Sequence, residues 1–208
     1  MPIEFTNPDQ GTAAADTLDY AGDPNFAGPL RVDGAEGDDE IRLNGYTGIA
    51  LAGSGDDFVA ANHGDDTVKG EEGNDTLLGQ GGSDKLFGGD GDDELEGGSG
   101  FDRIFGGSGD DRIVGGNDDD VLYGDNRGPG LDGSVGDDVF VFDDDDGNDK
   151  VWDFSVGDDL VELTDGTGYT LSYSGDNTIM TYGATTVTFY NATLTADDIY
   201  YATDMMMA

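Results

Sequence analysis

A nine-residue period of apolar positions runs through the middle of the chain. Residues 34–141 divide into consecutive nine-residue units without insertion or deletion, and the eighth place of every unit except that of Ala50 holds a large apolar residue. Alternate side chains of a strand face opposite ways, so the eighth-place residue points inward and its two neighbours point outward. Each unit therefore predicts one short strand. The eighth-place residues are Ile41, Ala50, Val59, Val68, Leu77, Leu86, Leu95, Ile104, Ile113, Leu122, Leu131 and Phe140.

Acidic residues and glycines repeat with the same period. The sixth place is Asp except at Gly48 and Pro129, and glycine is the commonest residue at the first, second and fourth places, where it allows the positive φ and close backbone approach of a tight loop. The resulting consensus, G-G-x-G-x-D-x-U-x with U apolar, is matched closely by residues 88–96 (GGDGDDELE) and 106–114 (GGSGDDRIV). This pattern resembles the calcium-binding repeat of the RTX, or haemolysin-type, family.

The resemblance implies an all-β fold, a right-handed parallel β-roll (a β-helix solenoid) in which two units make one turn. Units eighteen residues apart then stack, which predicts two columns of carboxylates, one on each edge of the roll. Calcium takes six to eight oxygen ligands, so neighbouring pairs predict about eight sites. The first predicted column is Asp39, Asp57, Asp75, Asp93 and Asp111, and the second is Asp66, Asp84, Asp102, Asp120 and Asp138. Beyond the regular frame, Asp149 and Asp159 are predicted to continue as metal ligands.

Composition supports counter-cations as the main partners. The 208 residues contain 47 Asp plus Glu, 8 Lys plus Arg and no Cys, with a formal charge of −39. Self-repulsion of this size opposes a compact state and disfavours contact with nucleic acid or anionic lipid. Thiolate sites are excluded, and zinc is disfavoured because His63 is the sole histidine. Without calcium, a solvated and disordered chain is the favoured alternative; Ca²⁺ is therefore expected to be part of the fold.

Four regions are expected along the chain. Residues 1–33 would form an N-terminal cap with a degraded repeat, 34–141 the calcium-binding roll, and 142–163 closing repeats. Residues 164–208 would form an antiparallel β cap and a C-terminal secretion signal. The degraded repeat keeps Asp16 at its sixth place.

The predicted cap consists of three alternating polar and apolar segments, 169–173, 178–182 and 185–190, with turn residues between them. Two internal units depart from the consensus. Residues 43–51 carry Gly48, which makes calcium beside it doubtful, and 124–132 predict an excursion or a vacant site. The run 143–147 fits an EF-hand poorly, because Phe142 stands where the first Asp should be.

An apolar stripe remains on the outer face of one predicted sheet. It is either covered by the chain's own terminal segments or serves as an intermolecular interface. Its ninth-place residues are Leu51, Lys69, Phe87, Phe105, Tyr123 and Val141, with Ile49, Val121 and Val139 nearby.

These features predict a secreted or cell-surface protein rather than an enzyme. No cleaved signal, membrane-length apolar run or familiar catalytic motif occurs in the sequence. The family resemblance implies export by type I secretion machinery, and the acidic-apolar tail 204–208 is similar to its uncleaved signal. We expect a calcium-dependent structural role in a surface layer, matrix or filament, with self-association into a homo-oligomer. The alternative is the non-catalytic export and folding module of a secreted hydrolase or toxin.

Overall fold

Two stacked β-sheets form the body of the molecule in the computed structural model, which describes residues 12, 14–20, 30–125, 136–164 and 168–202. The nine-stranded sheet is parallel, with its strands in the order β1 (Thr17–Asp19), β3 (Glu40–Arg42), β5 (Phe58–Ala60), β7 (Thr76–Gly81), β9 (Glu94–Ser99), β11 (Arg112–Asn117), β13 (Val139–Phe142), β15 (Leu160–Leu163) and β19 (Ile199–Tyr201).

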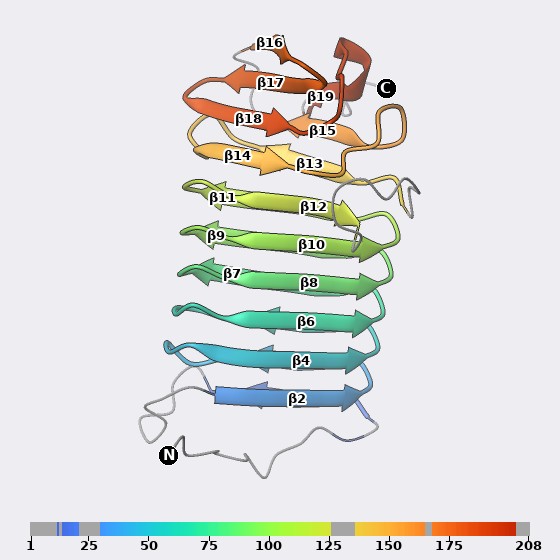
Figure 1. Cartoon of the computed structure of the whole chain (residues 1–208). Helices are drawn as coiled ribbons and strands as arrows, with labels where there is room; N and C mark the ends of the chain where they lie inside the picture. The colour runs from blue at the N-terminus through green and yellow to red at the C-terminus, as the bar shows by residue number, and fades with distance from the viewer. Residues whose placement is uncertain (1–11, 13, 21–29, 126–135, 165–167, 203–208) are drawn as a thin grey trace.

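The second sheet has ten strands and carries the antiparallel part of the fold at one end. Its order is β2 (Leu30–Glu36), β4 (Gly48–Ser54), β6 (Thr67–Glu72), β8 (Lys85–Asp90), β10 (Arg103–Ser108), β12 (Val121–Asp125), β14 (Asn148–Val151), β18 (Thr185–Phe189), β17 (Asn177–Tyr182) and β16 (Tyr169–Ser174). The chain alternates between the two sheets, so successive turns climb the long axis of the molecule (Figure 1). The predicted parallel β-solenoid is thereby confirmed.

Every described eighth-place residue lies in the core, as the apolar period predicts. From Ile41 to Phe140 these side chains are fully buried; Leu131 lies outside the described residues. Register partners such as Leu77 and Leu95 are eighteen residues apart. The first-place glycines also point inward, because they follow the eighth-place residue by two along a strand. The strands from β5 to β12 therefore each add one large side chain to a narrow core, whereas β4 adds the small Ala50.

Fourth-place glycines set the loops between strands. Gly55, Gly73, Gly91 and Gly109 have φ between +121° and +135°, a conformation that side-chain-bearing residues rarely adopt. An added Cβ on Gly91 would also collide with the backbone carbonyl of Gly73 in the preceding turn. Successive loops therefore stack closely, as the repeat pattern predicts.

The stacked strands begin before the regular repeats. β1 pairs with β3, with Leu18 opposite Ile41, so the degraded repeat around Asp16 is one more layer of the nine-stranded sheet. β2 pairs with β4 from Leu30 onward, with Val32 opposite Ala50. The prediction that the roll begins at residue 34 is therefore too late, because Val32 already fills the inward position in register with the eighth place.

The sequence spacing between stacked strands changes near the C-terminal end of the repeats. The register partner of Ile113 is Phe140, twenty-seven residues later instead of eighteen. The partner of Leu122 is Val151, at a spacing of twenty-nine. Layers that stack here are therefore more than eighteen residues apart in sequence, with the extra residues between Asp125 and Gly136. Most of the unit 124–132, for which an excursion or a vacant site is predicted, lies outside the described residues. The shift transfers β13 and its residues to the nine-stranded sheet.

The predicted antiparallel strands are present as β16, β17 and β18, and β18 joins the roll by pairing parallel to β14. Aromatic side chains fill this end: Phe154 lies between Phe140 and Phe189, at ring-centroid distances of 5.8 and 5.2 Å. The sequence pattern missed β19 and the short 3₁₀ helix η1 (Ala196–Asp198) before it. They add a final parallel strand beside β15.

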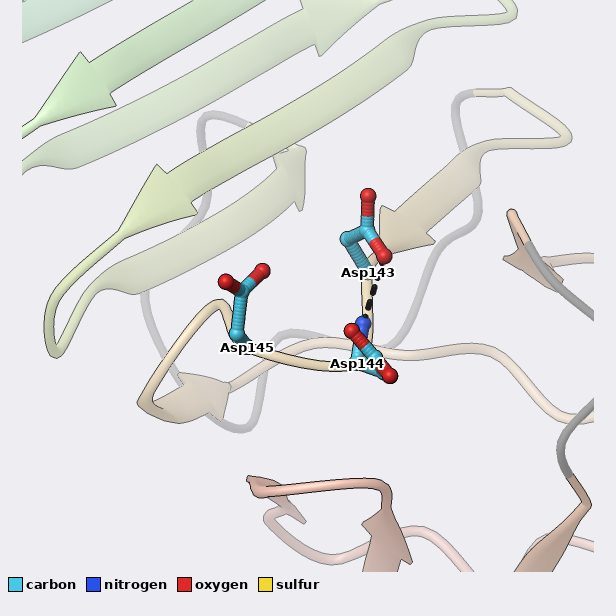
Figure 2. A group of neighbouring side chains, drawn as sticks. All are labelled: Asp143, Asp144 and Asp145. Carbon is cyan, nitrogen blue, oxygen red and sulfur yellow. Dashed lines mark hydrogen bonds between the residues drawn. The ribbon is translucent and has the colours of Figure 1, made fainter.

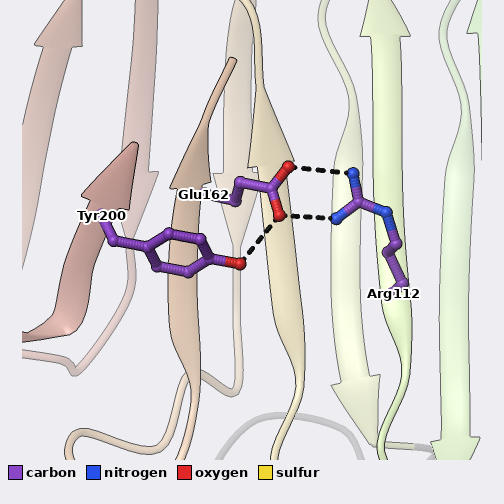
Figure 3. Close-up of polar contacts among 3 residues, drawn as sticks. All are labelled: Arg112, Glu162 and Tyr200. Atoms are coloured by element: carbon purple, nitrogen blue, oxygen red, sulfur yellow. Dashed lines mark hydrogen bonds and ion pairs between the residues drawn. The ribbon is translucent and has the colours of Figure 1, made fainter. Parts of the chain in front are cut away.

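A polar clamp ties the last strands to the repeats (Figure 3). The two terminal nitrogens of Arg112 in β11 donate to the two carboxylate oxygens of Glu162 in β15, at 3.0 and 3.1 Å. The hydroxyl of Tyr200 in β19 donates to the same carboxylate at 2.8 Å. Burial and the Glu162 carboxylate raise the pKa of Tyr200 to about 12, so its proton stays available for this bond.

Candidate metal centre

Sixth-place carboxylates form the first column along one edge of the roll. Oδ1 of each Asp accepts the backbone N–H of the corresponding Asp in the previous layer, for example Asp75 N–H to Asp93 Oδ1 at 2.8 Å. The same contact recurs at 2.7 to 3.0 Å along the column. In order, the first column contains Asp16, Asp39, Asp57, Asp75, Asp93, Asp111, Asp138 and Asp159.

The second column occupies the other edge and begins at Gly48, whose N–H donates to Asp66. It continues through Asp66, Asp84, Asp102, Asp120 and Asp149. The predicted place of Asp138 in this column is wrong, because its Oδ1 accepts the N–H of Asp111 in the first column. Asp149 takes its place and accepts the N–H of Asp120 at 2.9 Å.

The second oxygen of these carboxylates defines the candidate site. In ten of the twelve predicted ligands, Oδ2 is buried and has no hydrogen-bond partner within the described structure. These residues are Asp39, Asp57, Asp66, Asp75, Asp84, Asp93, Asp102, Asp111, Asp120 and Asp149. A buried anionic oxygen without a partner is costly, so each one requires a cation or a proton.

Both ends of the first column lack this feature. Asp16 Oδ2 accepts the N–H of Thr12 at 2.7 Å, and Asp159 Oδ2 accepts the N–H of Ser155 at 2.7 Å. At both ends, a backbone N–H of the chain thus donates to the Oδ2 atom, which has no partner in the ten orphaned carboxylates. Asp138 is buried but is not among the ten residues with an orphaned Oδ2.

The same geometry raises the pKa values of these carboxyls. Burial is the largest cause, and the charges of neighbouring column members add to it, while the backbone N–H donor acts in the opposite sense. The pKa rises from 3.8 to about 6 for Asp57, to about 7 for Asp93 and to about 9 for Asp120. The negative charge is therefore poorly solvated in the protein alone. A divalent cation beside Oδ2 would remove this penalty.

Backbone carbonyls supply a second set of oxygens. An added Cβ on Gly88 would meet both Oδ2 of Asp93 and the carbonyl oxygen of Gly106, and one on Gly79 would meet Asp84 Oδ2 and the carbonyl of Gly97. A carboxylate oxygen and a carbonyl oxygen thus converge over each of these first-place glycines. Hard oxygen donors of these two kinds suit calcium. The residues present therefore fit this ion.

Two further acids with raised pKa values fall outside the repeat frame, the buried Asp146 and the half-buried Asp153. Asp153 accepts the N–H groups of Gly124 and Asp125 at 2.8 and 3.2 Å, and its burial and the charge of Asp125 raise its pKa to about 7. Asp146 accepts from the N–H of Asp143 at 2.5 Å and also has a pKa raised by burial, to about 6. The nine-residue period could not identify these two acids, because the regular spacing between stacked layers is broken before them.

Asp143, Asp144 and Asp145 form a separate acidic turn (Figure 2), with one oxygen of each lying within 4.8 Å of the others. Two of the three side chains are exposed, and the N–H of Asp144 donates to Asp143. Solvent can stabilise these carboxylates, so the turn lacks the buried, unpartnered oxygens that mark the two columns.

Comparison with known families decides the nature of the repeats. The model of the RTX calcium-binding nonapeptide repeat matches residues 49–77, 69–104 and 96–126. The chain contains RTX calcium-binding repeats. RTX repeats bind calcium ions, which agrees with the oxygen donors described above. No curated protein sequence matches the chain.

Two solved structures resemble this chain weakly. The extracellular lipase of Serratia marcescens is 19% identical, with a TM-score of 0.34 over 85% of this chain; the chain spans 40% of the lipase's length. A subunit of the mannuronan C5-epimerase of Azotobacter vinelandii is 22% identical, with a TM-score of 0.28 over 90% of this chain and 87% of that subunit. Neither similarity bears on function. Within the described residues, no helix has the length and apolarity to span a membrane.

Proposed function

We propose that this chain is an exported, non-catalytic protein that folds on calcium and serves a structural role outside the cell. The ten buried, unpartnered Oδ2 atoms carry the proposal. They lie in two columns at the edges of the roll, each carboxylate joining two successive layers, so ion binding would stabilise the stacking of the strands. A structural metal whose site exists only in the folded chain contributes its binding free energy to folding.

We further propose that the ten orphaned carboxylates are the calcium ligands, together with backbone carbonyls of neighbouring loops. Neighbouring carboxylates of a column belong to adjacent layers, so one calcium ion bound between them would neutralise charge from both layers. Asp138 and Asp159 lie in the first column and complete its C-terminal end. Calcium in the columns would lower the self-repulsion of a chain with a formal charge of −39.

Export follows from the same coupling. At low calcium the buried carboxylates oppose folding, and an unfolded chain can be threaded through type I secretion machinery. Extracellular sites bind calcium with dissociation constants of about 0.1 to 1 mM, so folding would occur on arrival outside. A role as the folding module of a larger secreted enzyme would use the same step.

Circular dichroism during a calcium titration tests the proposal. We expect little β-structure in excess chelator and a cooperative gain of β signal as calcium rises to roughly millimolar concentration. Magnesium is the matched control, because its near-octahedral demand and reluctant dehydration make it a poor occupant of such loops. An unchanged β spectrum in chelator would refute calcium-dependent folding.

A further inference from the structure

The outer face of the ten-stranded sheet collects most of the positive charge of the chain. Seven of the eight basic residues lie in the described segments. Five of them are exposed at outward positions of this one sheet: Arg31, Lys69, Lys85, Arg103 and Lys150. The chain has 47 acidic residues, yet five of its eight basic residues lie on this single surface. We call these five residues the basic column.

The basic column has no ion pair within the described residues. The two basic residues of the nine-stranded sheet are both paired, Arg42 with Glu40 and Arg112 with Glu162. Lys85 and Arg103, in contrast, are register partners on adjacent strands. Adjacent strands are about 4.8 Å apart, so these like charges repel each other. The arrangement favours an anionic partner from outside the chain.

A ladder of aromatic rings runs beside the basic column. Phe87 stacks on Phe105 at 4.9 Å and Phe105 stacks on Tyr123 at 4.6 Å, with interplanar angles of 3° and 7°. The ammonium of Lys69 lies 5.7 Å from the centroid of the Phe87 ring. Because these rings stack on one another, their faces are already covered. The surface therefore suits a flat anionic partner better than a ligand that stacks on open ring faces.

The structure corrects the predicted extent of this stripe. Val141 and Val139 lie in β13 of the other sheet, and Val141 is buried. Trp152 and Tyr190 continue the stripe instead, because they follow Val151 and Phe189, which are the next inward residues in register. Their rings stack at 3.9 Å. The aromatic surface thus extends to the C-terminal strands.

A matching surface lies on the edge of the roll that holds the first column. Its fifth-place residues are exposed and form a second ladder, in which the side chains from Asp38 to Asp110 each accept the N–H of the fifth-place residue in the next layer at 2.9 to 3.1 Å. We call this ladder the outer acidic column: Asp38, Asp56, Asn74, Asp92, Asp110 and Asp137. The fifth places of the opposite edge include Ser83 and the exposed Phe101. Only the first edge therefore presents a nearly continuous row of carboxylates.

We propose that a second copy of this chain docks its outer acidic column against the basic column, beside the aromatic ladder. The inference rests on the proposed calcium-induced fold, because both columns exist only when the layers are stacked. Successive layers of the roll lie about 4.8 Å apart, so two parallel rolls can place Lys85 and Arg103, which are register partners on adjacent strands, opposite successive carboxylates of the outer acidic column. The fourth-place glycines beside the acidic column have no side chains to hold the surfaces apart.

The contact joins two different surfaces, the basic column of one copy and the outer acidic column of the other. Each pair of copies therefore still has one free basic column and one free acidic column. Such a heterologous contact builds an open filament or sheet unless its rotation closes a ring. The overall negative charge of the copies acts mainly at long range and is screened beyond about 8 Å at physiological salt. Local pairing of the two columns can then decide association.

Charge exchange tests the pairing with two variants. Lys85→Glu with Arg103→Glu reverses the basic column, and Asp92→Lys with Asp110→Lys reverses the outer acidic column. At saturating calcium we expect each variant alone to give the wild-type β signal in circular dichroism but no growth in light scattering. An equal mixture should recover growth, because reversed basic and reversed acidic columns attract each other. Glu94→Lys with Glu96→Lys, on the outer face of the other sheet, is the matched control and should leave growth intact.

The outcomes separate this inference from the proposed function. A wild-type chain that gains β-structure with calcium but stays monomeric overturns the docking while calcium-dependent folding stands. Growth of either reversed variant alone, or failure of the mixture, also overturns it. A third outcome is that the wild-type chain stays monomeric and is retained on immobilised polygalacturonate, whereas the Lys85→Glu, Arg103→Glu variant is not retained. The basic column would then bind an acidic polysaccharide and not a second copy of the chain.

Discussion

The regular layers and the C-terminal end of the molecule achieve the same strand stacking by different means. From β6 to β12 each strand buries one large aliphatic side chain, and the edges hold buried carboxylates with orphaned oxygens. From β13 onward the core contains Phe140, Phe142, Phe154 and Phe189, and a polar clamp joins three strands. Under the proposed function, the first region depends on bound calcium. The second relies largely on apolar burial, which needs no ligand.

Calcium removal should produce the largest difference between the two regions. As chelator is added, we expect backbone amides of β4 to β12 to lose hydrogen-exchange protection at calcium concentrations at which β17 and β18 are still protected. The reason is that unpaired carboxylates destabilise the regular layers, whereas the aromatic packing is unaffected. Simultaneous loss of protection in both regions would mean that they fold as one unit.

Acidification should partly replace calcium. In the metal-free roll the pKa values of Asp66, Asp93 and Asp111 are raised by burial from 3.8 to about 7, 7 and 8. The folded chain then binds more protons than the unfolded chain, so its stability is greatest below the unfolded value and is lost as pH rises through about 7 to 8. In excess chelator, circular dichroism should therefore show more β-structure near about pH 3 than near about pH 8. A β signal that instead increases with pH would contradict the burial of these groups.

Phe154→Ala should weaken the C-terminal end selectively. Phe154 is 6% exposed and its ring lies between those of Phe140 and Phe189. Loss of a buried Phe typically costs about 3 to 5 kcal/mol. Denaturant unfolding in saturating calcium, followed by hydrogen exchange of β14 and β18, measures the effect. Val156→Ala, at a site 48% exposed, is the control and should change little.

Asp93→Asn should weaken calcium binding in the middle of the first column. It removes charge from a buried carboxylate between two layers, and we expect the calcium midpoint of the β signal to rise at least about tenfold, as for other losses at metal sites. Asp92→Asn changes the same charge at the exposed neighbouring position and should shift the midpoint far less. Equal midpoints for the two variants would remove Asp93 from the proposed ligands.

Glu162→Gln should have the smallest effect. It weakens the paired contact with Arg112, whose side chain is 39% exposed, so solvent already screens part of the interaction. We expect a loss of about 0.5 to 1 kcal/mol in the free energy of unfolding of the C-terminal end. Glu94→Gln, an exposed acid on the same sheet, is the control. Identical thermal unfolding of the two variants would show that the clamp contributes nothing measurable.

Local repetition made much of this molecule predictable. Each unit carries its own loop glycine, carboxylate and inward apolar residue, so Leu77, Leu95 and Asp93 could be placed without knowing distant contacts. The alternating pattern likewise predicted β16, β17 and β18. Calcium as the ion followed from the family pattern and from the excess of acidic residues.

Only the tertiary structure decided how the layers pair beyond Asp125. A nine-residue period specifies what a unit looks like but not which earlier strand it pairs with, since every inward apolar residue offers an equivalent partner. Asp138 and Val141 therefore belong to the opposite column and sheet from those predicted, and Asp149 and Trp152 take their places. Strand register also decides three further features. These are the backbone N–H donors to Asp16 and Asp159, the pairing of β19 with β15, and the gathering of basic residues on one face. The sequence determined the chemistry of each layer, and stacking determined which residues share a surface.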